Sequence, residues 1–182
     1  MKADIRLFMS IIIFCSPLWA AIVNADSALP KGIIALDPTE APPLILNDLD
    51  GHTYDLQQAR GKWVFVHFWA SWCGPCKKEM KTIAAMAPVF RDTRLEIVLI
   101  NTAEDEETVF TFLGQVAPDM NTLMDNDGLV TEGWKPRGLP STYLVNPAGK
   151  IMYVVLGGRP WNDPAYQDFL LKLISATPPP GD

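Results

Sequence analysis

The stretch FWASWCGPCKKE, residues 68–79, lies between two different patterns of apolar residues and decides the fold of this chain. Residues 63–69 form an almost unbroken run of β-branched and aromatic side chains, which is typical of a strand covered on both faces. Residues 75–87 instead carry apolar side chains at helical spacing, with lysines elsewhere on the helix. The sequence therefore predicts a buried strand that leads directly into a helix at Cys73 and Cys76.

The two cysteines lie where the predicted helix begins. The unpaired N–H groups of a first helical turn and the positive end of the helix dipole stabilise a thiolate placed there. Cys73 is therefore the predicted nucleophile, and Cys76, one turn later and facing inward, is predicted to resolve the mixed disulfide. Between them, Gly74 permits close approach of a partner chain and Pro75 fixes an early helical position.

Other uses of such a cysteine pair have less support. A disulfide that closes so short a loop removes little chain entropy from the unfolded state, so stabilisation is a weak reason for it. Half of a zinc site needs further nitrogen or sulfur ligands, and His52 and His67 are not spaced like a partner pair. We therefore expect a redox-active disulfide between Cys73 and Cys76, with no metal and no other cofactor.

Length and composition indicate one globular domain, since 48% of the 182 residues are hydrophobic and 20% are charged. We place this α/β domain at residues 43–176. Asp50-Gly51 between two short apolar runs predicts a β-hairpin near its start. Further strands are predicted at 94–101, 121–124, 141–145 and 151–156. Helices are predicted after the apparent capping box Thr102-Ala103-Glu104-Asp105, at 129–134 and after Asp163.

Both ends of the chain are predicted to lie outside this domain. Residues 1–25 combine two early cations with an apolar stretch, the arrangement of a secretory signal that is either cleaved after Ala25 or retained as a membrane anchor. Residues 26–42, with Pro and acidic residues toward their end, are expected to form a linker, and residues 177–182 a disordered tail. The expected location is the periplasm or the extracytoplasmic face of the membrane.

The charge of the chain argues against nucleic acid as a partner. The formal net charge is −6, and the longest basic run is Lys77-Lys78. Binding to a phosphate backbone requires clustered lysine and arginine, which this sequence does not offer.

The cysteine stretch resembles the active-site segment of thioredoxins, and especially of the exported TlpA and ResA type oxidoreductases. Residues 46–62 are similar to that family's N-terminal hairpin, and residues 138–150 to the segment that carries its cis-proline. The resemblance covers residues 42–174. It implies a thioredoxin fold, with a central mixed β-sheet flanked by helices and an N-terminal β-hairpin extension.

The resemblance also assigns a substrate-binding role to residues around the cysteines. Pro140 is expected to follow a cis peptide bond and to lie against the cysteine pair, where it adds no competing N–H donor. The backbone of Leu139 is then free to pair with an extended substrate segment. Trp72, together with Gly74 and Pro75, is expected to line the surface on which the substrate docks.

Two residues are candidates for proton transfer. Glu79 matches the family's active-site acid, and a partly buried carboxyl one turn beyond Cys76 can relay protons to and from that thiol. The alternative is a solvated glutamate favoured by the helix dipole. His67 stands where cytoplasmic thioredoxins carry a buried aspartate, and a core histidine satisfied by the backbone is favoured over a catalytic one.

The combined prediction is an envelope protein-disulfide reductase. Gly-Pro between the cysteines resembles the reducing thioredoxins, whose potential is about −270 mV. By family resemblance the clients are oxidised proteins such as apocytochrome c or copper-site assembly proteins, and the electron donor is a membrane thiol transporter. The alternatives are a disulfide oxidase or isomerase, and a chaperone that binds Cu(I) through Cys73 and Cys76.

Overall fold

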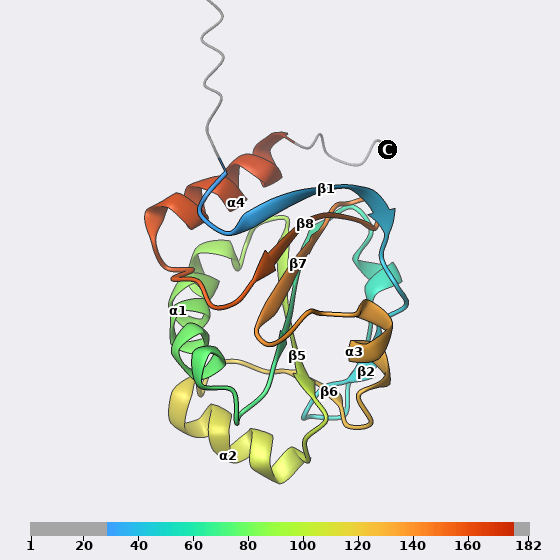
Figure 1. Cartoon of the computed structure of the whole chain (residues 1–182), viewed down its shortest axis with the longest axis vertical. Coiled ribbons are helices and arrows are strands. Elements are labelled where there is room, and N and C mark those ends of the chain that lie inside the picture. The colour runs from blue at the N-terminus through green and yellow to red at the C-terminus, as the bar shows by residue number, and fades with distance from the viewer. Residues whose placement is uncertain (1–28, 177–182) are drawn as a thin grey trace, which may run out of the picture.

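The computed structural model describes residues 29–176, which are built around a six-stranded mixed sheet in the order β1-β8-β7-β4-β5-β6 (Figure 1). β4 runs parallel to β5 and antiparallel to β7, so the predicted central strand has a partner on each side. The strands of this sheet are β1 (Ile33–Glu40), β4 (Trp63–Trp69), β5 (Leu95–Thr102), β6 (Leu123–Asp125), β7 (Ser141–Val145) and β8 (Lys150–Leu156).

β4 is buried along its whole length, as its apolar run predicted. Successive side chains of a strand point to opposite faces. Phe65 and Trp69 accordingly pack in one half of the core, and Val66 and Phe68 in the other. His67 shares its face of the strand with Phe65 and Trp69, which is the face covered by the helix that carries the cysteines.

Helices cover both faces of the sheet (Figure 1). α1 (Gly74–Phe90), α2 (Glu106–Val116) and α4 (Pro164–Ala176) contribute buried residues to the half of the core that contains Trp69. The other half is closed by α3 (Leu129–Trp134) and the 3-10 helix Leu56–Ala59. Within residues 29–176, no helix combines the length and the apolar character needed to cross a bilayer.

The predicted β-hairpin is confirmed as β2 (Ile45–Asn47) and β3 (Thr53–Asp55). Its turn requires a positive φ, which Gly51 supplies at 82°. The Asp48 carboxylate closes the turn by accepting hydrogen bonds of 2.9 Å from the backbone N–H groups of Asp50 and His52. A single β-bridge between Asp48 and Leu123 then attaches the hairpin to the main sheet.

The predicted linker is wrong for residues 33–40, because they form β1. This strand pairs antiparallel with β8, from Ile33 opposite Val155 to Glu40 opposite Lys150. Its proline, Pro38, lies where the register shifts, and β1 is an edge strand, where a missing backbone N–H is tolerated. The sheet therefore begins ten residues before the expected domain start at residue 43. The predicted leader, residues 26–28 and the predicted tail lie outside the described residues.

The start of α2 also differs in detail from the prediction. Asp105, not Thr102, caps the helix, since its carboxylate accepts a hydrogen bond of 2.8 Å from the Thr108 N–H. Glu104, the other acidic residue of the apparent capping box, instead accepts hydrogen bonds from Ser71 and Asn101.

Candidate active site

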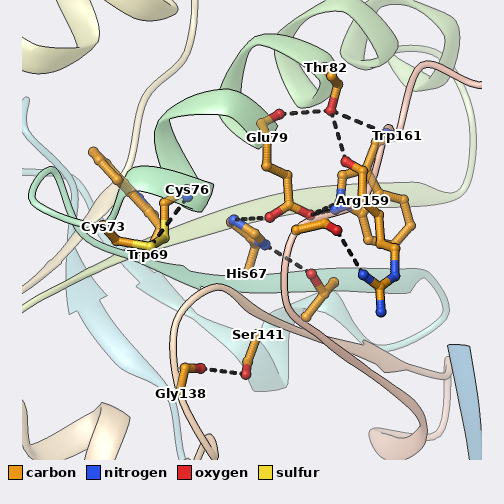
Figure 2. Close-up of polar contacts among 12 residues, drawn as sticks. His67, Trp69, Cys73, Cys76, Glu79, Thr82, Gly138, Ser141, Arg159 and Trp161 are labelled. Carbon is orange, nitrogen blue, oxygen red and sulfur yellow. Dashed lines mark hydrogen bonds and ion pairs between the residues drawn. A yellow bond between two sulfur atoms is a disulfide. The ribbon is translucent and has the colours of Figure 1, made fainter. Parts of the chain in front are cut away.

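The cysteine pair occupies the junction between β4 and α1. Cys73 is the N-cap residue of α1, and its Sγ accepts a hydrogen bond of 3.2 Å from the Cys76 N–H (Figure 2). The two residues form a disulfide. Cys73 is 5% exposed and Cys76 is fully buried, so Cys73 is the more accessible of the two cysteines.

The loop that leads to Cys73 is held by Glu104, in the segment between β5 and α2. The Glu104 carboxylate accepts hydrogen bonds from the Ser71 N–H, at 2.7 Å, and from the Ser71 hydroxyl. It also accepts one of 2.7 Å from Asn101, at the end of β5. Glu104 thus links the loop before Cys73 to the end of β5.

Glu79 lies three residues after Cys76, on the same buried face of α1, and is only 2% exposed. The alternative of a solvated glutamate is therefore wrong. Its Oε1 accepts hydrogen bonds from the Arg159 N–H, at 3.0 Å, and from the Trp161 indole N–H. Burial raises the pKa of the Glu79 carboxyl to about 7, against the opposing effect of these two donors and of the Arg159 charge.

The Arg159–Trp161 segment that surrounds Glu79 is fixed to α1 and to β8. Thr82 accepts a hydrogen bond of 3.1 Å from the Trp161 N–H. The Arg159 guanidinium donates to the carbonyls of Gly158 and Leu156, at 2.7 and 2.9 Å. Arg159 and Pro160 of this segment, together with Glu79 and Pro75, line a hollow of about 290 Å³.

His67 is fully buried beneath the active site. Its Nδ1 lies 2.9 Å from the Thr142 hydroxyl, so its partner is a side chain and not the backbone group that was expected. Its Nε2 lies 3.9 Å from Glu79 Oε2 (Figure 2). Burial lowers the pKa of the imidazole to about 3, and His67 is therefore neutral at physiological pH.

The peptide bond between Leu139 and Pro140 is cis, as the resemblance implied. Pro140 is buried and directly precedes β7, whose first residue, Ser141, pairs with Phe68 near the end of β4. The proline is therefore at the end of the sheet from which the cysteine loop leaves. The Ser141 hydroxyl donates to the Gly138 carbonyl at 2.7 Å and stabilises this turn (Figure 2).

The surface around Cys73 is open on the side expected to dock a substrate. Trp72 is 71% exposed, and Gly74 and Pro75 are exposed as well. Trp72 and Glu104 line a second hollow, of about 410 Å³. Leu139 is half-buried and packs against both halves of the core, so its side chain is anchored beside the cis bond.

One group of metal-ligand side chains occurs within residues 29–176, away from the cysteines. Asp48, Asp50 and His52, at the hairpin turn, have ligand atoms within 4.8 Å of one another. Asn121 donates to both aspartates, at 2.9 and 3.1 Å. These hydrogen bonds and the backbone bonds to Asp48 explain the cluster as part of the turn.

Comparisons with known proteins agree with this geometry. The sequence model of the AhpC/TSA family matches residues 38–154. The thiol-disulfide oxidoreductase ResA of Bacillus subtilis (strain 168) is 34% identical, over 86% of this chain and 88% of that protein. The ResA of Geobacillus thermodenitrificans (strain NG80-2) is 30% identical, over 86% and 91%. The chain belongs to the AhpC/TSA family, among its ResA-type thiol–disulfide oxidoreductases.

Solved structures place this ResA-type chain in the thioredoxin-like fold. A thiol:disulfide interchange protein from Bacteroides sp. is similar with a TM-score of 0.65 and 26% identity, over 78% of this chain and 91% of that one. StoA from Bacillus subtilis, with a TM-score of 0.59 and 21% identity over 67% and 92%, shares the fold. The predicted fold and enzyme class are thereby confirmed.

The cysteine motif identified the chemistry of this ResA-type enzyme, but not the residues around Glu79. The two donors to Glu79 lie 80 and 82 positions further along the chain, and nothing local to the motif indicates them. The run Arg159-Pro160-Trp161, shortly after the strand predicted at 151–156, is the local signal that could have indicated them. The residues missed from the sequence are Glu104, Thr142, Arg159 and Trp161.

Proposed function

We propose that this thiol–disulfide oxidoreductase is an extracytoplasmic reductase of protein disulfides. The observation that carries the proposal is the asymmetry of the cysteine pair, with Cys73 at the surface end of α1 and Cys76 buried behind it. Gly74 and Pro75 between them support reduction as the direction, and the predicted leader supports action outside the cytoplasm. The leader is either cleaved or retained as an anchor.

Reduction proceeds by two exchanges between sulfur atoms. The Cys73 thiolate attacks one sulfur of the client disulfide, a mixed disulfide forms, and the other client sulfur leaves as a thiolate. Cys76 then loses its proton and attacks Cys73 Sγ, which releases the second client thiolate and leaves the Cys73–Cys76 disulfide. Two electrons pass from the cysteine pair to the client.

Glu79 serves in this proposal as the acceptor of the Cys76 proton. It lies three residues beyond Cys76 on the same face of α1 and is shielded from water. Because burial raises the pKa of Glu79 to about 7, both its protonated and its ionised form are populated at neutral pH. A carboxyl with that balance can accept the proton in one half of the cycle and return it in the other.

The client binds, in this proposal, across the exposed surface beside Cys73. Trp72 supplies an aromatic contact, Gly74 and Pro75 leave room for a backbone, and Leu139 offers backbone groups next to Pro140 for strand addition. Clients are exported proteins with oxidised cysteine pairs, such as apocytochrome c or copper-site assembly proteins. A membrane thiol transporter regenerates the dithiol.

Trapping tests the division of labour between the cysteines. Cys76→Ala should stall the reaction as a mixed disulfide on Cys73, visible on non-reducing gels and identifiable by mass spectrometry. Cys73→Ala is the matched control and should trap nothing. Equal trapping by both variants would contradict the assigned roles.

The redox equilibrium with glutathione tests the direction of electron flow. A potential of about −270 mV, the value of reducing thioredoxins, is the expected result. A value of about −120 mV, as in strong oxidants, would instead identify a disulfide oxidase.

A further inference from the structure

The two oxygens of Glu79 have different surroundings. Oε1 receives both N–H donors, one from Arg159 and one from Trp161. Oε2 is buried without a hydrogen-bond partner and lies 3.9 Å from His67 Nε2. A proton on the carboxyl therefore belongs on Oε2, because Oε1 already faces two donors.

His67 Nε2 is the matching atom. It too is buried without a hydrogen-bond partner, and it faces Glu79 Oε2 (Figure 2). A neutral imidazole has one donor nitrogen and one acceptor nitrogen. If Nε2 is the acceptor, then Nδ1 carries the ring proton and donates it to the Thr142 hydroxyl, with which it is already in contact at 2.9 Å.

We propose that His67 is the positioning residue of the proton on Glu79, which sits on Oε2 and is accepted by His67 Nε2 while Thr142 fixes the ring proton on Nδ1. The 3.9 Å separation is about 1 Å longer than a typical hydrogen bond, and in this proposal the shared proton draws the two atoms together. The inference rests on the proposed role of Glu79 as the proton acceptor of Cys76.

The proton balance follows from this arrangement. The ionised pair presents two facing lone pairs, on Oε2 and Nε2, and takes up one proton from the Cys76 thiol, which becomes the attacking thiolate. His67 stays neutral throughout, in agreement with the lowered pKa of its buried ring. Within residues 29–176, the other titratable or charged groups near the pair are Lys78 of α1, Arg159 after β8, and Cys76 on the buried face of α1 that also carries Glu79. Thr142 of β7 and Phe65 of β4 carry no charge.

Nitrogen NMR of the wild-type protein, labelled in its histidine rings, tests the arrangement directly. The chain has two histidines, and the exposed His52 serves as the internal reference. We expect the His67 ring proton on Nδ1 at every pH, and an Nε2 resonance that shifts as the pH passes through 7, where Glu79 titrates. A ring proton on Nε2, or an Nε2 resonance that does not move, would overturn the proposal.

Two variants separate a positioning role from simple packing. Glu79→Gln should abolish the pH-dependent shift of the Nε2 resonance. His67→Leu, which keeps the site apolar, should move the protonation midpoint of Glu79 downward, because the acid form loses its acceptor. An upward move would show that His67 donates to the carboxylate instead. If either variant fails to fold, the wild-type resonances alone decide.

The NMR experiment and the trapping experiment test the role of His67 and the reductase mechanism separately. A ring proton on Nε2 combined with successful trapping by Cys76→Ala would refute only the inference about His67. Failure of trapping with the expected resonances would refute the reductase mechanism and leave the proton site in place.

Discussion

Replacing Glu79 by glutamine should make the protein more stable relative to wild type as the pH rises. The folded protein holds the pKa of Glu79 at about 7, whereas the ordinary value is 4.5. Below pH 4.5 the Glu79 carboxyl is protonated in both the folded and the unfolded protein, so it does not lower the free energy of unfolding. As the pH rises to about 7 the unfolded state releases the proton first, so the stability of the wild type falls, and above 7 the deficit is constant.

The size of this deficit follows from the difference between the two pKa values. At about 1.36 kcal/mol per pKa unit, the rise from 4.5 to about 7 corresponds to about 3 kcal/mol. Glutamine has no proton to lose, and its carbonyl can still accept from Arg159 and Trp161. The variant therefore lacks the pH-dependent deficit, whatever constant effect the substitution has.

Urea unfolding of both disulfide-bonded proteins at a series of pH values measures the effect. The stability of Glu79→Gln minus that of wild type should increase by about 3 kcal/mol between the acid limit and pH above 7. The contribution of His67, which is present above pH 6.5 and lost as the pH falls toward 3, is common to both proteins and cancels. A difference that does not vary with pH would refute the reasoning, and one that decreases would mean that the fold favours the carboxylate.

Three further changes test other parts of the structure. Trp161→Phe removes a donor to Glu79 Oε1 but keeps an aromatic ring, and should move the protonation midpoint of Glu79 upward in a titration followed by carboxyl infrared absorption. Glu104→Ala removes the acceptor of Ser71 and should lower the unfolding free energy by about 2 kcal/mol in urea, with a smaller loss for Glu104→Gln. A chain that starts at residue 41 lacks β1 and should melt well below one that starts at residue 29 in thermal unfolding by circular dichroism; equal melting temperatures would mean that β1 adds nothing to the fold.

The part of the fold that could be predicted is the part that is specified locally. The strand ending at Trp69 and the helix beginning at Gly74 follow from adjacent runs of different period, and Gly51 supplies its own turn signal. β1 could not be predicted in this way. Its partner, β8, lies more than 100 residues further along the chain, and Pro38 has the composition of a linker until the edge position of the strand is known.

The same difference between local and long-range signals holds for the candidate site. Cys73, Cys76 and the cis bond before Pro140 could be anticipated from short motifs. The sequence left the burial of Glu79 open between two alternatives and did not indicate the partner of His67, because both depend on segments brought in by β7 and by the turn after β8. Periodicity places Glu79 on the helix but does not say what covers it.

The two edges of the sheet determine how readily this protein forms unwanted β-pairs with other chains. Unfolded chains offer unpaired backbone, and a long regular edge strand would template aggregation with them. β1 interrupts one edge with Pro38 and an irregular register, and β6 limits the other edge to three residues. The molecule thus resists indiscriminate β-pairing along its flanks, and the client docking that we propose beside Pro140 lies away from both edges, at the start of the interior strand β7.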